Sequence, residues 1–452
     1  MLKSIKIKKL LERFDYELNF SDEGIMIITG PNGYGKSTIL KMIDDFCNNG
    51  MENVLSYPFK TFIINCEQNS VIIKKNKEIF KINEISLPYP DTKSFERRRG
   101  FPPYLRRVGF DEYIDIRTQE KIRLINSPHK NIFDGMSFED RFFYSILDAW
   151  EDAQGKKPIK FEENTGKLKS VIETISKVKK EIGKVSLIQE QRLLEKRDIP
   201  DDERSYRPSR IEYITVINEN SKRLKNELAE IMQSHSSLSN ELDSTYIKRL
   251  FDADSANEGD AKNITEMRTE LQELQEKQEK LQKYGLSEIK NVSYISTLEE
   301  EKLNKFATEL SIYLQDANAK FRVFEPIINK LALYEDIVNN KLNFKKMFLS
   351  STKGIVVESD DGKKLDLNNL SSGEQEILVL FYKLIFESDV NLLLIDEPEI
   401  SLHVAWQKEI MDNFKRIVKL KPDMQVMIAT HSPQIISHNW DLQIDLGGLY
   451  NG

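Results

Sequence analysis

The stretch GPNGYGKST at residues 30–38 constrains the fold of this chain more than any other sequence feature. Gly30, Gly35, Lys36 and Ser37 satisfy the pattern G-x-x-x-x-G-K-[ST], in which the glycines let backbone N–H groups turn inward around phosphate oxygens. Lys36 adds a mobile positive charge for the β- and γ-phosphates, Ser37 offers a hydroxyl to Mg²⁺, and the N-terminus of the following helix completes the positive field. The residues that we expect to contact ATP lie in this loop or in the first turn of its helix: Asn32, Gly33, Gly35, Lys36, Ser37 and Thr38.

Acidic side chains at the end of another apolar strand complete the predicted site. In NLLLIDEPE, residues 391–399, the apolar run ends at Asp396, whose carboxylate can bind Mg²⁺ directly or through water at the edge of a sheet. Glu397 follows it and can orient or deprotonate the water that attacks the γ-phosphate. The alternative is a strand that ends in two capping acids before a turn proline. Because the same chain contains a phosphate-binding loop, we favour metal binding for Asp396 and water activation for Glu397.

Short apolar runs predict one buried sheet around the loop. IMIIT at residues 25–29 leads into the loop, and the apolar runs within 390–399, 425–432 and 442–446 are expected to lie beside it. Residues 61–83 alternate between apolar runs and polar turns, which predicts two or three antiparallel strands. The N-terminal part of the chain is therefore expected to be rich in strands.

The middle of the chain has a different pattern. Between about residues 205 and 345, leucine, isoleucine and methionine recur at three- and four-residue spacing among charged residues, which is typical of amphipathic and coiled-coil helices. Proline is absent from residues 211–322, so long helices can form there. We predict an α/β nucleotide-binding domain built from residues 1–204 and 346–452, with a helical, coiled-coil insertion over 205–345.

The segment NLSSGEQEILVL, residues 369–380, gives the chain a specific family resemblance. It resembles the signature sequence LSGGQ of ABC-type ATPases, and its five places are taken by Leu370, Ser371, Ser372, Gly373 and Glu374. Ser372 stands where that motif has glycine, and Glu374 stands where it has glutamine. The form with glutamate is familiar among soluble members of the RecF and overcoming-lysogenisation-defect (OLD) type. The resemblance implies an ABC-type P-loop ATPase head in which Ser371, Gly373 and Glu374 cap the γ-phosphate bound by a partner subunit. At least a dimer is then required; the plain alternative is an ordinary helix cap.

Two further residues take their roles from the same resemblance. His431 follows a short strand and matches the switch histidine that contacts the γ-phosphate. Gln191 lies where this class places the Q-loop glutamine, which senses Mg²⁺ and couples the insertion to the nucleotide; Gln189 competes for this role, and an exposed polar turn is the plain alternative. The resemblance thus implies Glu397 and His431 as catalytic residues. The implied metal ligands are Ser37, Asp396 and Gln191.

Two other segments match parts of the same family. PEISLHVAWQ at residues 398–407 resembles the D-loop, which would bring Ser401 and His403 to the dimer seam, although Val404 stands where a proline is usual. We expect the first strands of the chain to form a β-hairpin that carries Arg13 and Phe14, and such domains often contact adenine from this hairpin. Phe14 fits the hydrophobic core equally well.

Composition restricts the classes of protein that the chain can belong to. Its formal net charge of −7 argues against a protein that coats nucleic acid along its whole surface. No stretch approaches the ~20 apolar residues of a membrane span, and the N-terminus has no signal-peptide pattern, so we expect a cytoplasmic protein. An arginine-rich loop at residues 95–110 is either a patch for nucleic acid or an acidic partner, or a solvated loop whose arginines stack on neighbours.

The family resemblance also suggests what the ATPase is for. OLD-family nucleases continue after the switch histidine into a metal-dependent TOPRIM domain, which we do not expect in the short segment after His431. The chain resembles the stand-alone ATPases of two-gene bacterial antiphage systems such as PARIS and Septu. That resemblance implies a sensor and scaffold that forms a larger homo-oligomer, responds to a phage-derived trigger and controls a separate effector nuclease. The alternative is a RecF-like repair ATPase that binds duplex DNA.

Overall fold

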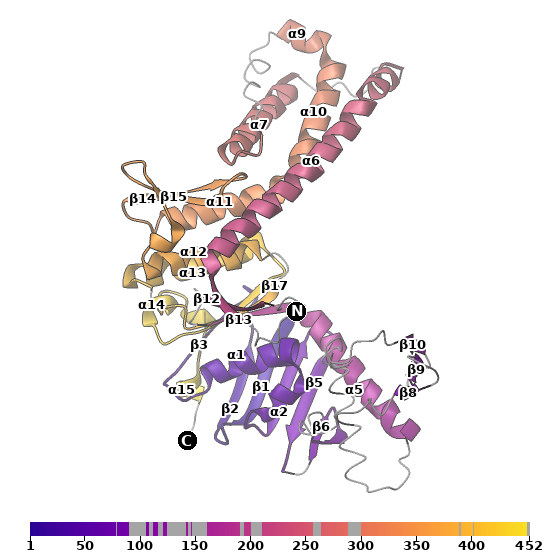
Figure 1. The fold of residues 1–452 in the computed structure, drawn as a ribbon, viewed down its shortest axis with the longest axis vertical. Coiled ribbons are helices and arrows are strands. Elements are labelled where there is room, and N and C mark those ends of the chain that lie inside the picture. Colours follow the sequence, from indigo (N-terminus) through magenta and orange to yellow (C-terminus); the bar gives the residue numbers. More distant parts are fainter. Residues whose placement is uncertain are drawn as a thin grey trace. The chain divides into compact units, whose positions relative to one another are not determined.

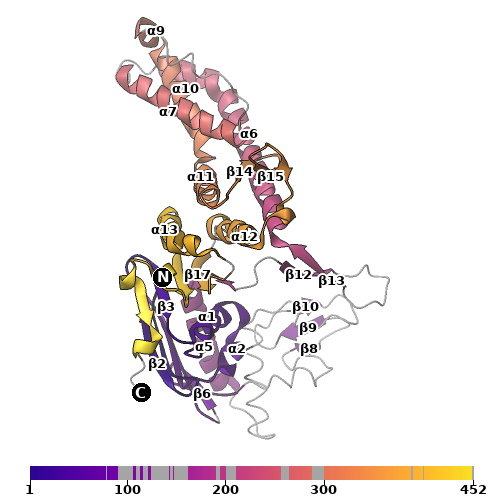
Figure 2. The same ribbon diagram turned by 90° about the vertical axis from the view of Figure 1, so that its left-hand side faces the viewer.

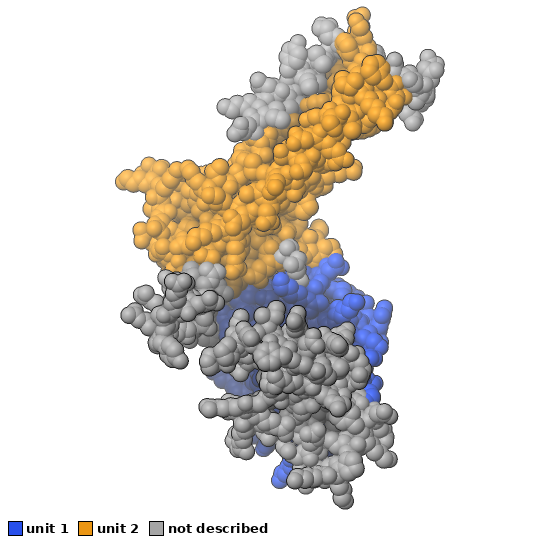
Figure 3. All heavy atoms as spheres, turned by 45° about the vertical axis from the view of Figure 1, so that its right-hand side comes forward, with its two compact units in different colours: residues 1–189, 389–398, 423–452 blue, residues 190–388, 399–422 orange. Residues whose placement is uncertain are grey.

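The computed structural model describes residues 1–77, 79–89, 105–107, 112–115, 121–123, 142, 146, 161–189, 194–199, 210–255, 264–287, 300–387, 390–400 and 402–449. Figures 1 and 2 label the helices and strands. The chain forms two compact units, coloured blue and orange in Figure 3. Unit 1 comprises residues 1–189, 389–398 and 423–452, and unit 2 comprises residues 190–388 and 399–422.

A parallel sheet in unit 1 carries the phosphate-binding loop. Over the described residues, its strands follow the order β11-β17-β18-β3-β19. Their bounds are β3 Ile25–Thr29, β11 Lys184–Ile188, β17 Val390–Asp396, β18 Gln425–Ala429 and β19 Gln443–Asp445. All these pairings are parallel, and β3 and β18 are buried along their whole length. The predicted sheet of short apolar strands is confirmed, since a parallel sheet buried on both faces requires continuous apolar runs.

The N-terminal strands of unit 1 form an antiparallel sheet. Its order is β2-β1-β4-β5-β6-β7 within the described ranges. The bounds are β1 Leu2–Leu10, β2 Phe14–Asn19, β4 Thr61–Cys66, β5 Ser70–Lys75, β6 Ile79–Ile82 and β7 Ile85–Pro88. Burial alternates along β2, so Phe14, Tyr16 and Leu18 face the core. The antiparallel strands predicted over residues 61–83 are confirmed. A separate antiparallel group consists of β8 Leu105–Arg107, β9 Glu112–Asp115 and β10 Lys121–Arg123.

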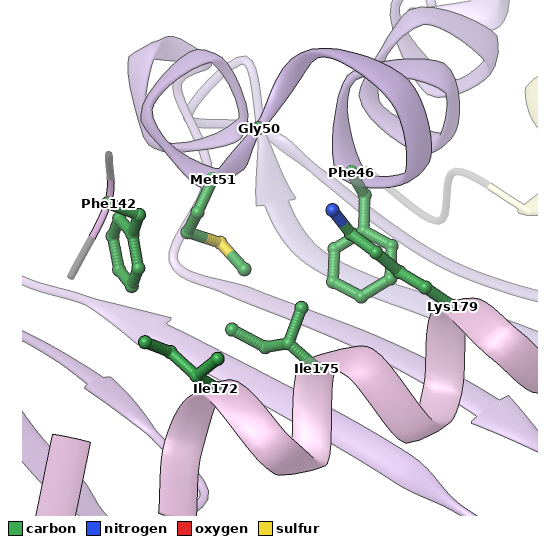
Figure 4. Close-up of a pocket in the computed structure, with 7 residues that line it drawn as sticks. All are labelled: Phe46, Gly50, Met51, Phe142, Ile172, Ile175 and Lys179. Atoms are coloured by element: carbon green, nitrogen blue, oxygen red, sulfur yellow. The ribbon is translucent and has the colours of Figure 1, made fainter. Parts of the chain in front are cut away.

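Helices in unit 1 cover these sheets and share one hydrophobic core with them. The helical segments are α1 Lys36–Asp44, η1 Asp45–Asn49, α2 Met51–Ser56, α5 Phe161–Ile182, α14 Pro433–Ile436, η4 Trp440–Leu442 and α15 Leu446–Leu449. The core joins Ile39 of α1 and Val178 of α5 to residues of both sheets. A small apolar pocket lies between Phe46 and Met51 on one side and Ile175 of α5 on the other (Figure 4). It belongs to the packing of α5.

Unit 2 is mainly helical and contains the predicted insertion. Its helices are α6 Val216–Ser255, α7 Ile264–Lys283, α9 Glu300–Lys305, α10 Ala307–Arg322, α11 Glu325–Asn339, α12 Ser372–Phe386 and α13 Val404–Leu420, with the short η3 Leu367–Asn369. Its strands are β12 Leu194–Ile199, β13 Arg210–Thr215, β14 Lys345–Ser350, β15 Gly354–Ser359 and β16 Lys364–Leu365. Helix α10 contacts both α6 and α7 in a helical arm, where Met267, Leu271 and Leu314 form a small core (Figure 1). The predicted amphipathic, coiled-coil-like helices are confirmed.

The two units do not follow the predicted division at residues 204 and 345. Residues 346–388, which the motifs group with the nucleotide-binding domain, belong to unit 2. The reason is packing: α12 contacts α6 and α11, and most of its apolar residues are buried. The signature segment is therefore built into the same unit as the helical insertion.

Some predicted features lie outside the described residues. They include Gln191, Ser401 and most of the arginine-rich loop over 95–110, of which β8 is described. None of the helices in the described ranges combines the length and apolarity that crossing a membrane requires.

Candidate functional site

The phosphate-binding loop connects β3 to α1 and takes a conformation that requires glycine. Gly30, Gly33 and Gly35 have positive φ angles of 140°, 83° and 90°. At Gly35 an added Cβ atom would lie 2.8 Å from Cδ2 of Leu10, so even alanine would displace that side chain. Helix α1 begins at Lys36, directly after the loop. The loop thus lies between the carboxyl end of β3 and a helix N-terminus, a place that favours an anion.

The side chain of Lys36 lies at the centre of a polar cluster. Its Nζ donates hydrogen bonds to the carbonyl oxygens of Gly30, at 2.8 Å, and Pro31, at 3.3 Å. It also lies 3.4 Å from Nδ1 of His431, whose Nε2 is 3.5 Å from Oε1 of Glu397. The structure therefore brings Lys36, His431 and Glu397 together from three separate sequence motifs.

Ser37 and Asp396 form a direct contact across the end of the sheet. The Ser37 hydroxyl donates a hydrogen bond of 2.8 Å to Oδ1 of Asp396, which ends β17 and is only 8% exposed. Mg²⁺ prefers hydroxyl, carboxylate and phosphate oxygens, and typically takes only one or two ligands from the protein. A hydroxyl and a carboxylate oxygen side by side therefore fit the predicted magnesium site.

Glu397 has an unusual backbone conformation. Its φ angle is 48°, in the left-handed region that few residues other than glycine adopt. Its N–H donates to the carbonyl oxygen of Ala429 at 2.9 Å, which ties the turn after β17 to the end of β18. Backbone strain of this kind is commonly found at functional sites. The strained residue here is Glu397, whose carboxylate lies beside His431.

The other predicted contact residues of this loop differ in exposure. Asn32 and Gly33 are exposed in the loop, whereas Thr38 is half-buried in the first turn of α1. All three lie within six residues of Lys36, and their contacts with ATP stay a prediction. Gln191, the predicted metal-sensing glutamine, lies outside the described residues.

The signature segment forms a well-defined helix cap in unit 2. Ser371 is the N-cap of α12, and its side chain and that of Glu374 bond reciprocally in a capping box. Ser371 and Ser372 are exposed, and Gly373 is half-buried in the first turn. The ordinary helix cap, which the sequence left open as an alternative, is thus present. The contact of this helix end with a partner's phosphate stays a prediction.

The D-loop segment also caps a helix. His403 is the N-cap of α13, where its Nδ1 accepts a hydrogen bond of 3.3 Å from the N–H of Ala405. Val404, which replaces the usual proline, is the first residue of this helix and is exposed. The predicted role of His403 at a dimer seam therefore stays open, and Ser401 lies outside the described residues.

The motifs did not identify Tyr16 of β2, which braces the phosphate-binding loop. The Tyr16 hydroxyl donates a hydrogen bond of 2.9 Å to the carbonyl oxygen of Tyr34, within the loop. The Phe14 ring stacks on Tyr16, with centroids 5.7 Å apart, and packs at a tilt against Tyr34, with centroids 4.9 Å apart. Phe14 is therefore a core residue. Burial raises the pKa of Tyr16 well above its ordinary value, so the hydroxyl keeps the proton that it donates. The alternation of apolar and polar residues in FDYELN, residues 14–19, places Tyr16 on the inner face of the strand but does not identify the partner of its hydroxyl.

We predict that Tyr16→Phe weakens nucleotide binding about threefold to tenfold, because one net hydrogen bond contributes about 0.5–1.5 kcal/mol. Titration with a fluorescent ATP analogue measures the change. Tyr57→Phe is the matched control, because its hydroxyl also bonds within unit 1, to Asp45. Equal affinities in the two variants would show that the contact with Tyr34 does not shape the loop.

Comparison with known proteins gives a family match over most of the chain. The family model described as "AAA ATPase domain" matches residues 1–436. The chain is 26% identical over 212 residues to the "Retron Ec83 probable ATPase" of Escherichia coli, which covers 44% of this chain and 36% of that protein. It is 27% identical over 116 residues to the "DNA double-strand break repair Rad50 ATPase" of Sulfurisphaera tokodaii, which covers 23% of this chain and 13% of that protein. The chain thus spans less than half the length of either relative.

Solved structures of SMC head domains resemble the chain over most of its length. The head domain from Pyrococcus furiosus with an extended coiled coil, bound to the C-terminal domain of ScpA, is 11% identical at a TM-score of 0.36, and the match covers 96% of this chain and 91% of that one. The head domain from Thermotoga maritima is 9% identical at a TM-score of 0.32, with 96% and 90% covered. Similarity of this degree carries no argument about what the chain binds.

Proposed function

The chain belongs to the AAA ATPase domain family, and from this premise we propose a role for it in bacterial antiphage defence. It is an ATPase. In the proposed role it forms a homo-oligomer, senses a phage-derived trigger and controls a separate effector nuclease. ATP, bound together with Mg²⁺, sets the state of the assembly.

One observation carries the proposed chemistry: the cluster of Lys36, Ser37, Asp396, Glu397 and His431 within unit 1. Lys36 and the loop around it bind the phosphates of ATP. Ser37 and Asp396 would hold Mg²⁺, which when bound would offset negative charge on the phosphate oxygens. Glu397 accepts a proton from the attacking water, and His431 contacts the γ-phosphate from its place between Lys36 and Glu397. These assignments are the part of the proposal that the geometry supports best.

We further propose that two copies of the chain share each nucleotide. The N-terminus of α12, a helix of 15 residues, is the end where its dipole favours an anion. Ser371 and Ser372 are exposed there. The resemblance to the signature sequence assigns this end to the γ-phosphate held by a partner copy. At least a dimer follows, and the resemblance to the PARIS and Septu ATPases supports a larger oligomer.

The defence role rests on two kinds of similarity. The ABC-type motifs with a helical insertion of modest length resemble the stand-alone ATPases of two-gene antiphage systems. In addition, one relative is named "Retron Ec83 probable ATPase". Both similarities support an ATPase that acts through a partner.

Purification of the chain together with the product of the neighbouring gene tests this role. We expect a stable complex of several ATPase copies with a nuclease whose activity depends on the nucleotide and on phage components. Nuclease assays with ATP, ADP and no nucleotide, before and after infection, provide the readout. A monomer that neither binds the neighbouring product nor alters its nuclease activity would count against the proposal.

A DNA-binding repair ATPase is the second candidate, favoured by the similarity to a Rad50 ATPase. This function predicts that duplex DNA stimulates ATP hydrolysis. The stimulation should weaken by about tenfold or more between 50 and 200 mM salt, because binding to phosphates releases counterions. Hydrolysis that is independent of DNA at both salt concentrations would exclude this candidate. The net charge of −7 speaks against extensive contact with DNA.

A further inference from the structure

Glu374 places a carboxylate at the helix end that is proposed to meet a phosphate. One of its oxygens accepts hydrogen bonds from the N–H of Ser371, at 2.9 Å, and from the Ser371 hydroxyl, at 2.8 Å. Glu374 is only 8% exposed, so water screens its charge poorly. An ionised carboxylate here repels an incoming phosphate, whereas the glutamine of the LSGGQ motif carries no charge.

Lys345, the first residue of β14, neutralises this carboxylate. Its Nζ donates to Oε1 of Glu374 at 2.8 Å and to Oε2 at 2.9 Å. Burial opposes the ionisation of Glu374, but the hydrogen bonds from Lys345 and Ser371 outweigh it and hold the pKa of Glu374 below its ordinary value. The two side chains thus form an ion pair with no net charge at neutral pH.

The backbone around Lys345 is firmly held. The β14 strand pairs with β15, with Lys345 opposite Ser359. The side-chain amide of Asn339, at the end of α11, accepts from the N–H of Met347 at 2.7 Å and donates to its carbonyl oxygen at 3.0 Å. The ammonium of Lys345 therefore extends toward Glu374 from a fixed strand.

We propose that Lys345 is a positioning residue of the signature segment. Its ammonium cancels the charge of Glu374, so that the N-terminus of α12 can accept the terminal phosphate of ATP bound by a second copy. The ion pair gives this helix end the charge that a neutral glutamine would give it. It also holds Glu374 in the capping box that orients Ser371. This inference rests on the proposed sharing of ATP between two copies.

The experiment measures ATP-dependent dimerisation in a Glu397→Gln background, in which hydrolysis is expected to be slow. We expect Lys345→Met to weaken the ATP-dependent dimer by at least about tenfold, because it leaves a buried carboxylate unpaired beside the phosphate. Lys346→Met is the matched control: it removes the same charge from the next residue, which is exposed and lies near the ring of Phe348. The control should dimerise like the parent. Sedimentation or mass photometry over a range of protein concentrations gives the dissociation constants.

Combining Lys345→Met with Glu374→Gln shows whether the dimerisation defect of Lys345→Met comes from an uncompensated charge or from an altered structure. If Lys345 acts by cancelling charge, the double variant should dimerise within about threefold of Glu374→Gln alone, since no uncompensated carboxylate remains. This inference alone is overturned if Lys345→Met dimerises as strongly as the parent. It is also overturned if Glu374→Gln does not relieve the dimerisation defect of Lys345→Met. Absence of any ATP-dependent dimer in the parent with Lys345 intact overturns the proposed shared site together with it.

Discussion

Lys36→Ala should reduce ATP affinity by at least about 100-fold and abolish measurable hydrolysis. The Lys36 ammonium is the only positive side chain among the described residues of the cluster that joins the loop to His431 and Glu397. Hydrogen bonds to charged groups contribute about 1.5–3 kcal/mol each, and Lys36 is placed to make more than one to the β- and γ-phosphates. Equilibrium binding of a fluorescent ATP analogue and a phosphate-release assay measure the two effects.

Lys41→Ala provides the matched control for this loss. Lys41 lies on the same helix, α1, but its side chain is exposed. The control should bind and hydrolyse ATP like the wild type and show the same melting temperature as Lys36→Ala. Near-normal ATP binding by Lys36→Ala would contradict the assignment of the phosphate-binding loop.

Glu397→Gln should separate binding from hydrolysis. The amide keeps the size of the side chain but cannot accept the proton of the attacking water, so kcat should fall by about 10²–10⁴-fold. Affinity for ATP should stay within about threefold of the wild type, because Lys36 and the loop remain intact. With hydrolysis stalled, the ATP-bound dimer should accumulate, which size analysis with and without ATP can detect.

The control for this variant is Asp423→Asn, since Asp423 is an exposed acid before β18, outside the cluster. It should leave both kcat and the oligomeric state unchanged. Hydrolysis at the normal rate by Glu397→Gln would remove Glu397 from the role of water activation and leave His431 as the next residue to test.

The sequence predicts one buried sheet and assigns Ser37 and Asp396 to one magnesium site, and the structure brings these two residues into contact although they are separated by 359 positions. The reason is that apolar runs specify buried parallel strands, and the carboxyl ends of such strands meet at one edge. Local pattern thus determines which residues share that edge.

Contacts that depend on packing between elements could not be predicted in the same way. No local pattern places Lys345 on Glu374 or the Tyr16 hydroxyl on the carbonyl of Tyr34, because each pair depends on how separate strands and helices pack. The sequence also does not predict the left-handed backbone conformation of Glu397, since glutamate has no preference for that conformation. For the same reason the motifs gave no sign that residues 346–388 pack with the insertion.

Glu397 also lies close to a boundary between the two units. In this stretch Pro398 is the last residue of unit 1 and Glu399 is the first residue of unit 2, so a single peptide bond joins the two units here. The hydrogen bond from the Glu397 N–H to the Ala429 carbonyl oxygen fixes this turn, so the residue assigned to water activation is anchored to β18 two positions before the chain enters unit 2.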